Sequence, residues 1–266
     1  MKELSLLDKV VIITGSSKGI GFAMAKEFAE NNGAIVIICS RILENAKKAA
    51  SLIKGKTFAA KLDVTDDSSV KDFINQIMSC FDRIDVLVNN SGYPFDRNIW
   101  YKKFHDGKIE DLDKIIEVDL KGSIRLSKSV IPIMIQNAAK RQSDTNEIKC
   151  GGVIINISST PAISGYSGGS LYNIVKAANL SLTKCIAKEY ALNNIRAYTL
   201  ALGNIATIAT YYSMTEDERI NAAKESPMKR WGKPEEIAKV AACIASDSFS
   251  FASGNTIVLD GGEVIL

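Results

Sequence analysis

The sequence predicts an α/β protein built on a doubly wound, parallel, seven-stranded sheet with helices on both faces. Short apolar runs alternate with longer segments of helical period along the whole chain, which favours strands joined by helices. Several of the runs are β-branched with little polar alternation, as expected for strands covered on both faces. Since no linker, repeat or low-complexity segment interrupts the 266 residues, we expect a single domain over residues 1–266.

The individual elements follow from the same pattern. The predicted strands are the apolar runs at 9–14, 34–39, 57–62, 85–89, 152–157, 195–201 and 256–259. The predicted helices are the segments 19–31, 43–53, 68–80, 112–136, 171–192 and 234–245. The last helix has a clear start, because Pro234 presets φ and the two glutamates after it lie near the positive end of the helix dipole.

Two polar stretches interrupt the alternation. Residues 136–152 are predicted to form a solvated loop. Residues 93–112 carry four aromatic side chains, namely Phe95, Trp100, Tyr101 and Phe104. That is much aromatic surface for a loop, so this insertion is either a lid or a packed surface excursion.

Composition and charge argue against several classes of function. The 33 Lys and Arg are scattered among 30 acids, with a net charge of +3, whereas a nucleic-acid surface needs clustered positive charge. No apolar run approaches the roughly 18 residues that span a bilayer, and the N-terminus has no secretory pattern. Five widely spaced cysteines lack zinc spacing and predict reduced thiols in a cytoplasmic protein. His105 is the only histidine, so no metal cluster or Ser–His–Asp triad is expected.

A glycine-rich turn joins the first predicted strand to the first predicted helix, in "VVIITGSSKGIGFAMAKEF". Gly15, Gly19 and Gly21 let the backbone turn tightly and approach a pyrophosphate, while the helix N-terminus offers free N–H donors. Because the turn lies directly after an apolar strand and before an amphipathic helix, it predicts a Rossmann-like dinucleotide site.

The spacing Thr-Gly-x-x-x-Gly-x-Gly resembles that of the classical short-chain dehydrogenase/reductase family. Further motifs follow in the family's order: "LDVTD" (62–66), "NNSG" (89–92), "INISS" (155–159), "YNIVK" (172–176) and "PMKRWGKPEEIA…FASGNTIVLDGG" (227–262). The resemblance covers essentially the whole chain. It implies an oxidoreductase that uses a nicotinamide cofactor.

The end of the second predicted strand distinguishes NAD from NADP. An acid there would hydrogen-bond the ribose 2′-hydroxyl and repel a 2′-phosphate, but this chain has Ser40 followed by Arg41. Lys18 is a second cation that could reach the same phosphate. NADP(H) is therefore predicted over NAD(H).

The resemblance assigns further cofactor contacts. It implies that Asp63 contacts the adenine amine with Val64 beside the ring, and that Asn90 and Gly92 line the path to the nicotinamide ribose. The full set of expected cofactor-binding residues is Gly15, Ser17, Lys18, Gly19, Ile20, Gly21, Ser40, Arg41, Asp63, Val64, Asn90, Ser91, Gly92, Tyr172, Lys176, Gly203, Ile205 and Thr207.

Tyr172 and Lys176 lie one helical turn apart, so their side chains share a face. A nearby ammonium favours the phenolate and lowers the pKa of a tyrosine from its usual value of about 10. Tyr172 is then a candidate general acid in carbonyl reduction and general base in alcohol oxidation. The resemblance implies that Lys176 also binds the nicotinamide ribose. It identifies Ser159 as the hydroxyl that donates to the substrate oxygen, with the adjacent Ser158 as the alternative.

Two positions depart from the family's pattern. Asp119, in "VDLKGS", stands where the family has an asparagine that positions a water of the proton relay. A carboxylate only accepts hydrogen bonds unless it is protonated. Asp119 is therefore expected either to hold that water next to Lys176 or to pair with Lys176 and weaken its effect on Tyr172. Leu202 replaces the usual proline before Gly203, which predicts a less rigid backbone there.

The segment after Gly203 is expected to contribute to substrate binding. Residues 204–228 are predicted to form a mobile flap over a largely apolar pocket. The expected lining residues are Tyr93, Pro161, Ala162, Tyr166, Tyr211, Tyr212 and Met214. They favour a ketone and secondary alcohol pair with an aliphatic, cyclic or acyl body over a highly anionic substrate.

Together with the family resemblance, these residues predict an NADP(H)-dependent carbonyl reductase or alcohol dehydrogenase. The alternative is a catalytically weak nucleotide-binding or regulatory protein, which the changes at Asp119 and Leu202 motivate. An enoyl reductase of the divergent branch would carry a tyrosine seven residues before Lys176, where this chain has Gly169. The long helices at 112–136 and 171–192 resemble those through which family members assemble, so a homotetramer is expected.

Overall fold

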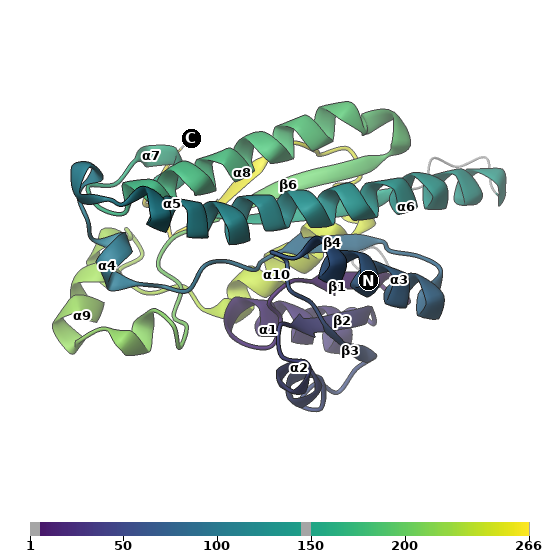
Figure 1. Ribbon diagram of the computed structural model, residues 1–266, viewed down its shortest axis with the longest axis horizontal. Coiled ribbons are helices and arrows are strands. Elements are labelled where there is room, and N and C mark those ends of the chain that lie inside the picture. The colour runs from purple at the N-terminus through teal and green to yellow at the C-terminus, as the bar shows by residue number, and fades with distance from the viewer. Residues whose placement is uncertain (1–5, 145–149, 266) are drawn as a thin grey trace.

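The computed structural model describes residues 6–144 and 150–265 of the chain. Seven strands form one fully parallel sheet in the order β3-β2-β1-β4-β5-β6-β7, which confirms the predicted fold class (Figure 1). The strands are β1 (Val10–Ile13), β2 (Ile35–Ser40), β3 (Thr57–Lys61), β4 (Val86–Asn89), β5 (Gly152–Ser159), β6 (Ile195–Leu202) and β7 (Thr256–Leu259). Each begins and ends within two residues of its predicted run.

Helices join these strands. The longer ones are α1 (Gly19–Lys26), α2 (Leu43–Ala50), α3 (Asp67–Phe81), α5 (Ile109–Ile115), α6 (Gly122–Asp144), α8 (Ser170–Glu189), α9 (Glu216–Glu225) and α10 (Pro234–Ala245). The short ones are α4 (Arg97–Trp100), η2 (Phe104–Asp106), α7 (Pro161–Ser164), η4 (Ala191–Asn193), η5 (Tyr211–Ser213) and η6 (Asp247–Phe249). Two π-helical segments, η1 (Glu27–Asn31) and η3 (Ile116–Lys121), continue α1 and α5.

Both faces of the sheet are covered by helices. On one face, Val11 and Ile13 of β1 belong to a buried apolar cluster with residues of α1, α2 and α10. On the other face, Val10 and Ile12 belong to a second cluster with residues of α3, α6 and α8. Because alternate residues of a strand point to opposite faces, the continuous apolar run in β1 is what a doubly covered strand requires.

A chain of buried polar side chains crosses the centre of the sheet. Asn89 of β4 donates to the Asn156 side chain of β5 at 2.8 Å, and Asn156 donates to Thr183 of α8 at 2.8 Å. The hydroxyl groups of Thr183 and Thr199 of β6 lie 2.7 Å apart. Buried polar groups need such partners, so this series of hydrogen bonds fixes how α8 lies on β5.

The order of the strands creates the crevice that holds the site. After β3 the chain returns to the other side of β1 and continues with β4, so β1 lies between β2 and β4. In open parallel sheets ligands bind beyond the carboxyl ends of the strands where the order reverses. The residues that follow β1 and β4, including Gly15 and Asn90, lie at that point.

The prediction for residues 136–152 is wrong for its first part. Helix α6 continues through to Asp144, and Asn137 is buried and donates to the Ile84 carbonyl at 3.3 Å. The run "QNAAKRQSD" is polar, yet Gln, Ala, Lys and Arg are strong helix formers. Residues 145–149 lie outside the described part of the chain, and Gly152 already belongs to β5. Within the described residues, no helix has the length and apolar character needed to cross a membrane.

Candidate active site

The predicted site residues come together at one edge of the sheet. All strands are parallel, so their carboxyl ends lie on the same side. The glycine turn follows β1, Ser40 ends β2, Asn90 follows β4, Ser159 ends β5 and Gly203 follows β6. Residues that are up to almost 190 positions apart in the chain therefore face a shared crevice.

The glycine turn has the close packing that its sequence predicts. Gly15 and Gly19 have φ of +64° and +58°, a region that favours glycine. A Cβ on Gly21 would lie 2.6 Å from both the Gly15 carbonyl oxygen and Asn90 Nδ2. Gly21 is thus required for α1 to approach the loop after β4.

Thr14 organises this loop, a role that the sequence analysis did not assign. Its hydroxyl oxygen accepts the backbone N–H groups of Asn90 at 2.9 Å and Ser91 at 2.8 Å. Asn90 Nδ2 in turn donates to the Thr14 carbonyl at 2.8 Å. The only available signal was the threonine before the first glycine. Ser16 likewise accepts the backbone N–H of Cys39 at 3.0 Å, which ties the turn to β2.

The turn fits a dinucleotide phosphate. No described side chain caps the N-terminus of α1 at Lys18, so its first N–H groups are free to bind an anion. A Cβ on Gly19 would meet nothing within 4 Å, which leaves open space in front of those donors. Ser17 and Ile20 are half-buried beside them. These residues would hold the pyrophosphate of a nicotinamide dinucleotide.

The end of β2 has the charges expected for a phosphate partner. Lys18 and Arg41 are exposed, and within the described residues neither side chain has a hydrogen bond or ion pair. Asp63, after β3, accepts from the backbone and hydroxyl of Thr65 at 3.0 and 2.7 Å. Burial raises the pKa of Asp63, but these hydrogen bonds and the charge of Arg41 lower it more. The neighbouring Val64 is buried.

Tyr172 and Lys176 lie on one face of α8, with Ser159 at the end of β5. The Lys176 ammonium is 5.5 Å from the centre of the Tyr172 ring. The Ser159 hydroxyl donates to the Leu202 carbonyl at 3.3 Å and acts on the Tyr172 phenol, whose pKa it lowers. Ser158 points the other way, since its buried hydroxyl donates to the Lys176 carbonyl at 2.8 Å. Of the two serines, Ser159 is the one on the Tyr172 side.

Asp119 pairs directly with Lys176, the second of the two expected arrangements. The ion pair is 2.8 Å long, and both side chains are buried. The other carboxylate oxygen accepts the backbone N–H of Tyr93 at 2.6 Å, and Lys176 also donates to the Ile157 carbonyl at 3.3 Å. Asp119 lies in the π-helical segment η3, a distortion that is frequent at functional sites.

The electrostatic balance at Tyr172 differs from the sequence expectation. Burial raises the pKa of Tyr172, the Lys176 charge lowers it, and the Asp119 charge raises it again, so that the pKa lies above its usual value. Burial lowers the pKa of Lys176, but the charges of Asp119 and Tyr172 outweigh burial and hold it above its usual value. The free protein therefore has a neutral phenol next to a buried, neutralised ion pair.

The insertion at 93–112 packs over this site. The ring of Trp100 in α4 lies on the ring of Tyr172, with centroids 4.2 Å apart and planes at 30°. Phe95 packs edge-on against Trp100 at 4.8 Å and against Tyr101 at 6.1 Å. Tyr93 and Tyr172 both pack on a small buried cluster formed by Ile99, Ile115, Leu171 and Val175. The sequence indicated an aromatic insertion but not its contact with Tyr172.

The predicted flap at 204–228 packs against itself and against the residues that directly follow it. Ile205 is buried and bridges to Gly232, and the Thr207 hydroxyl bonds that of Thr210 at 2.9 Å. Tyr211 packs on Tyr212 and on Trp231, with ring centroids 5.3 and 5.2 Å apart. Within the described residues, no ring contact joins these tyrosines to Tyr172.

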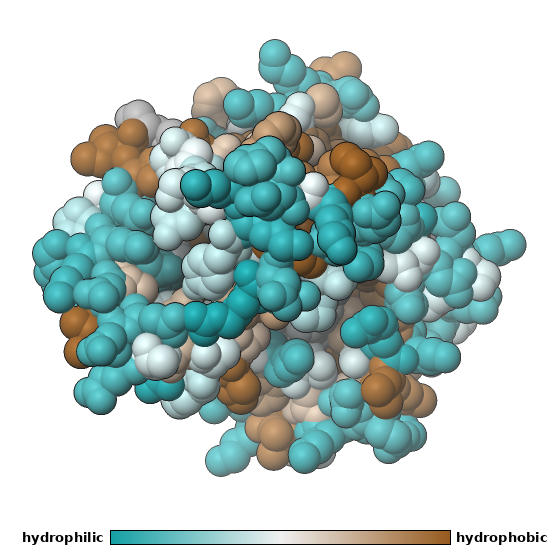
Figure 2. All heavy atoms as spheres, turned by 60° about the vertical axis from the view of Figure 1, so that its left-hand side comes forward, coloured by the Kyte–Doolittle hydropathy of each residue, from teal (hydrophilic) through white to brown (hydrophobic). Residues whose placement is uncertain are grey.

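The other expected pocket residues follow the carboxyl ends of β5 and β6 in the chain. Pro161 and Ala162 begin α7 directly after β5, Met214 is half-buried after η5, and Tyr166 is 52% exposed. Arg97 of α4 forms an ion pair with Glu218 of α9, which joins the insertion to the flap. Figure 2 brings this side of the molecule forward and shows a mainly hydrophilic surface with separate hydrophobic patches.

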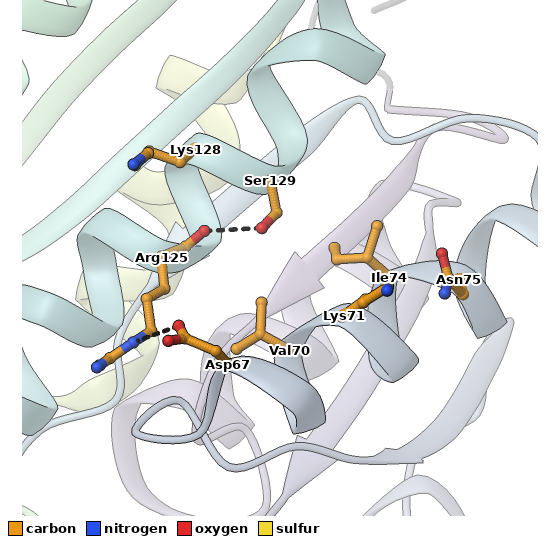
Figure 3. Close-up of a pocket in the computed structure, with 8 residues that line it drawn as sticks. All are labelled: Asp67, Val70, Lys71, Ile74, Asn75, Arg125, Lys128 and Ser129. Atoms are coloured by element: carbon orange, nitrogen blue, oxygen red, sulfur yellow. Dashed lines mark hydrogen bonds and ion pairs between the residues drawn. The ribbon is translucent and has the colours of Figure 1, made fainter.

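A surface groove lies between α3 and α6 (Figure 3). Its volume is about 280 Å³. Its lining residues are Asp67, Val70, Lys71, Ile74, Asn75, Arg125, Lys128 and Ser129. None of them belongs to the predicted site, and Arg125 is occupied by Asp67 at 2.8 Å. The groove is therefore lined by other residues than the crevice, although Arg125 also donates to the Val64 carbonyl at 3.4 Å.

A nucleotide cradle and a Tyr–Lys pair on one edge of a parallel sheet define a class, the nicotinamide-dependent oxidoreductases of the doubly wound α/β fold. Residues 15–263 match the family model described as "Enoyl-(Acyl carrier protein) reductase". The chain belongs to the short-chain dehydrogenase/reductase family, as the sequence motifs predicted. It is accordingly an oxidoreductase of carbonyl and alcohol groups.

Three relatives illustrate the range of similar proteins. The 3-oxoacyl-[acyl-carrier-protein] reductase FabG of Thermotoga maritima is 36% identical over 98% of this chain and 100% of its own length. Glucose 1-dehydrogenase 2 of Bacillus subtilis is 31% identical over 98% of this chain and 96% of its own. The crystal structure of 3-ketoacyl-(acyl-carrier-protein) reductase from Brucella melitensis, complexed with NADH, has a TM-score of 0.86 at 30% identity, covering 98% and 100% of the two chains.

Proposed function

We propose that the protein is an NADP(H)-dependent oxidoreductase that interconverts a ketone and a secondary alcohol. The observation that carries this proposal is the position of Tyr172, whose ring lies 5.5 Å from the Lys176 ammonium and whose phenol interacts with the Ser159 hydroxyl, at the sheet edge that holds the glycine cradle. When bound, the nicotinamide supplies or accepts the hydride. The chain's own residues then have to bind the carbonyl oxygen and deliver its proton.

Each residue of the site has a distinct task in this proposal. Tyr172 donates its proton to the carbonyl oxygen in reduction and removes it from the alcohol in oxidation. Ser159 donates a hydrogen bond to the same oxygen and stabilises the negative charge that develops there. Lys176 favours the phenolate by its charge. Asp119 is a positioning residue, because both of its oxygens are engaged, one by the Lys176 ammonium at 2.8 Å and the other by the backbone N–H of Tyr93.

The preference for NADP(H) is supported by the residues around the end of β2. Ser40 leaves no carboxylate to repel a 2′-phosphate, and Arg41 and Lys18 are two exposed cations whose side chains form no hydrogen bond or ion pair within the described residues. Guanidinium and ammonium groups are common phosphate ligands. We expect Ser40→Asp to weaken NADPH binding and favour NADH, measured as the ratio of kcat/KM for the two cofactors. An unchanged ratio would remove the basis of the assignment.

The catalytic assignment is tested by NADPH oxidation over a panel of ketones. We expect the wild type to turn over, and Tyr172→Phe to lose activity by roughly a thousand-fold, since general acid catalysis contributes about 10²–10⁴. Tyr190→Phe is the matched control, because Tyr190 follows the C-terminal end of α8, whereas Tyr172 lies in its first turn. Unchanged turnover in Tyr172→Phe would refute the assigned acid.

A catalytically weak nucleotide-binding protein is the second candidate. The observation that favours it is the direct pair between Asp119 and Lys176, which neutralises the charge that would activate Tyr172. In that case NADPH binds but no carbonyl compound is reduced. If calorimetry shows that NADPH binds and no ketone is turned over, this second candidate is the correct one.

An enoyl reductase is not supported, although the matching family model carries that description. The tyrosine of the divergent branch would replace Gly169, which has φ of +65° and lies so close to the Trp100 carbonyl that a Cβ would be 2.9 Å from it. We further propose a homotetramer, by resemblance to the family, and a cytoplasmic location, which the five free cysteines favour. Sedimentation as a monomer would reject the tetramer.

A further inference from the structure

Trp100 lies directly against the proposed proton donor. Its ring covers one face of the Tyr172 ring, and Phe95 packs edge-on against it at 4.8 Å. The Trp100 carbonyl lies against Gly168 and Gly169, where added Cβ atoms would be only 3.2 and 2.9 Å from it. The indole is therefore held over Tyr172 by packing and by its backbone position.

The Trp100 indole N–H is a buried donor without an acceptor in the described part of the chain. A buried tryptophan normally finds a partner, because its N–H has lost water and gains nothing in return. The other tryptophan shows the usual situation, since Trp231 Nε1 donates to the Arg219 carbonyl at 2.9 Å. An unpaired donor beside a reacting group needs an explanation, and a ligand acceptor is the simplest one.

We propose that Trp100 selects the substrate by donating its indole N–H to a second oxygen, on the carbon next to the reacting carbonyl. This inference rests on the proposed function, because it places the reacting carbonyl at the Tyr172 hydroxyl. Because the two rings are in contact, with centroids 4.2 Å apart, a small substrate bound at the Tyr172 hydroxyl would lie next to the indole. The substrate class is thus α-hydroxy ketones and α-diketones.

Binding of such a substrate requires the indole to move, because its N–H is closed to solvent. Helix α4 is a single turn of four residues, attached at its start by the Asp96 cap and to α9 by Arg97 and Glu218. A substrate with a second oxygen restores the missing hydrogen bond when the indole shifts. A substrate without that oxygen leaves the donor unpaired, so the two differ in their affinity for the opened site.

The test compares 3-hydroxybutan-2-one with 3-methylbutan-2-one, in which a methyl group of similar size replaces the hydroxyl. Trp100→Phe keeps an aromatic ring and removes the N–H. We expect its kcat/KM for the hydroxy ketone to fall roughly ten- to hundred-fold, with the methyl ketone changed about two-fold at most. Trp231→Phe is the matched control, because its N–H already has a partner in the chain, and it should change both ketones by the same factor.

Each outcome separates this inference from the proposed function. If the wild type reduces both ketones equally well, or if Trp100→Phe impairs both by the same factor, the enzyme stands and the role of Trp100 is overturned. If the wild type reduces neither these ketones nor any other carbonyl, the proposed function fails first.

A second measurement covers the case in which Trp100→Phe does not fold. The chain has two tryptophans, so in Trp231→Phe all indole fluorescence comes from Trp100. With NADP⁺ bound, butane-2,3-dione should shift the emission and 3-methylbutan-2-one should not, and neither can be turned over because neither has an alcohol group to oxidise. Equal responses to the two ketones would overturn the proposal.

Discussion

Asp119→Asn is the substitution that most directly tests the charge balance at Tyr172. It removes one negative charge from the buried pair with Lys176 and keeps an oxygen that can accept the N–H of Tyr93. Asp119 raises the pKa of Tyr172, so its removal lowers that pKa. Alcohol oxidation, which needs the phenolate, should then start at a lower pH than in the wild type. Carbonyl reduction, which needs the neutral phenol, should likewise be lost at a lower pH than in the wild type.

The size of the effect follows from two distances. The carboxylate oxygen is 2.8 Å from the Lys176 nitrogen, which is 5.5 Å from the ring centre of Tyr172. The charge is therefore at most roughly 8 Å from the ring, where an effective dielectric constant of about 20 gives an interaction of about 2 kcal/mol. Part of this is offset because an unpaired Lys176 in the variant holds its own proton less firmly. We expect alcohol oxidation at neutral pH to become about ten-fold faster, the equivalent of about 1.4 kcal/mol.

The assay is the pH dependence of kcat in both directions for the wild type and Asp119→Asn. Asp113→Asn is the control, because Asp113 in α5 is exposed and its removal changes the net charge equally. A thermal melt confirms that the variant is folded, since breaking a buried pair is destabilising. A folded Asp119→Asn whose pH profiles coincide with those of the wild type would show that Asp119 does not influence Tyr172.

Two further predictions concern the cradle and the sheet. Gly21→Ala should weaken NADPH binding roughly ten-fold or more, about 1.4 kcal/mol, because its Cβ would lie 2.6 Å from Gly15 and Asn90. Fluorescence titration measures this, and Ser79→Ala, at an exposed position of α3, should bind NADPH as the wild type does. Asn156→Val should destabilise the fold by about 3 kcal/mol in urea unfolding, because it leaves the amide of Asn89 buried without this partner. A loss below about 1 kcal/mol would contradict the structural role of the polar chain.

The sheet and the glycine cradle could be predicted from the sequence because their signals are local. A β-branched run followed by a turn and an amphipathic helix defines a strand and its crossover without knowledge of the rest of the chain. The turn after β1 also requires glycines at Gly15 and Gly19 for its own backbone conformation. The C-terminal end of α6 was harder to predict, because a polar run with high helix propensity is also typical of a loop.

The contacts of Asp119 and Trp100 could not be predicted from residue patterns. Sequence reasoning left open whether Asp119 holds a water or pairs with Lys176, because residue spacing does not give the distance between two side chains on different helices. Burial decides between them, as a buried ammonium needs a direct counter-charge more than an exposed one does. Trp100 is 72 positions from Tyr172, and only the folding of α4 onto α8 brings the rings together.

Asp119 and the insertion act on Tyr172 through one connection. One carboxylate oxygen holds Lys176, and the other holds the N–H of Tyr93, where the insertion begins. If the insertion shifts when a substrate enters, the shift would pull on the carboxylate that neutralises Lys176. Loosening that pair would expose Tyr172 to more of the ammonium charge and lower its pKa when a substrate is present. We infer that the free protein keeps Tyr172 protonated, the form needed to reduce a carbonyl group. An Asp119→Asn variant in which substrate no longer alters the pH profile would be the expected sign of this connection, whereas an unaltered response to substrate would place the coupling elsewhere.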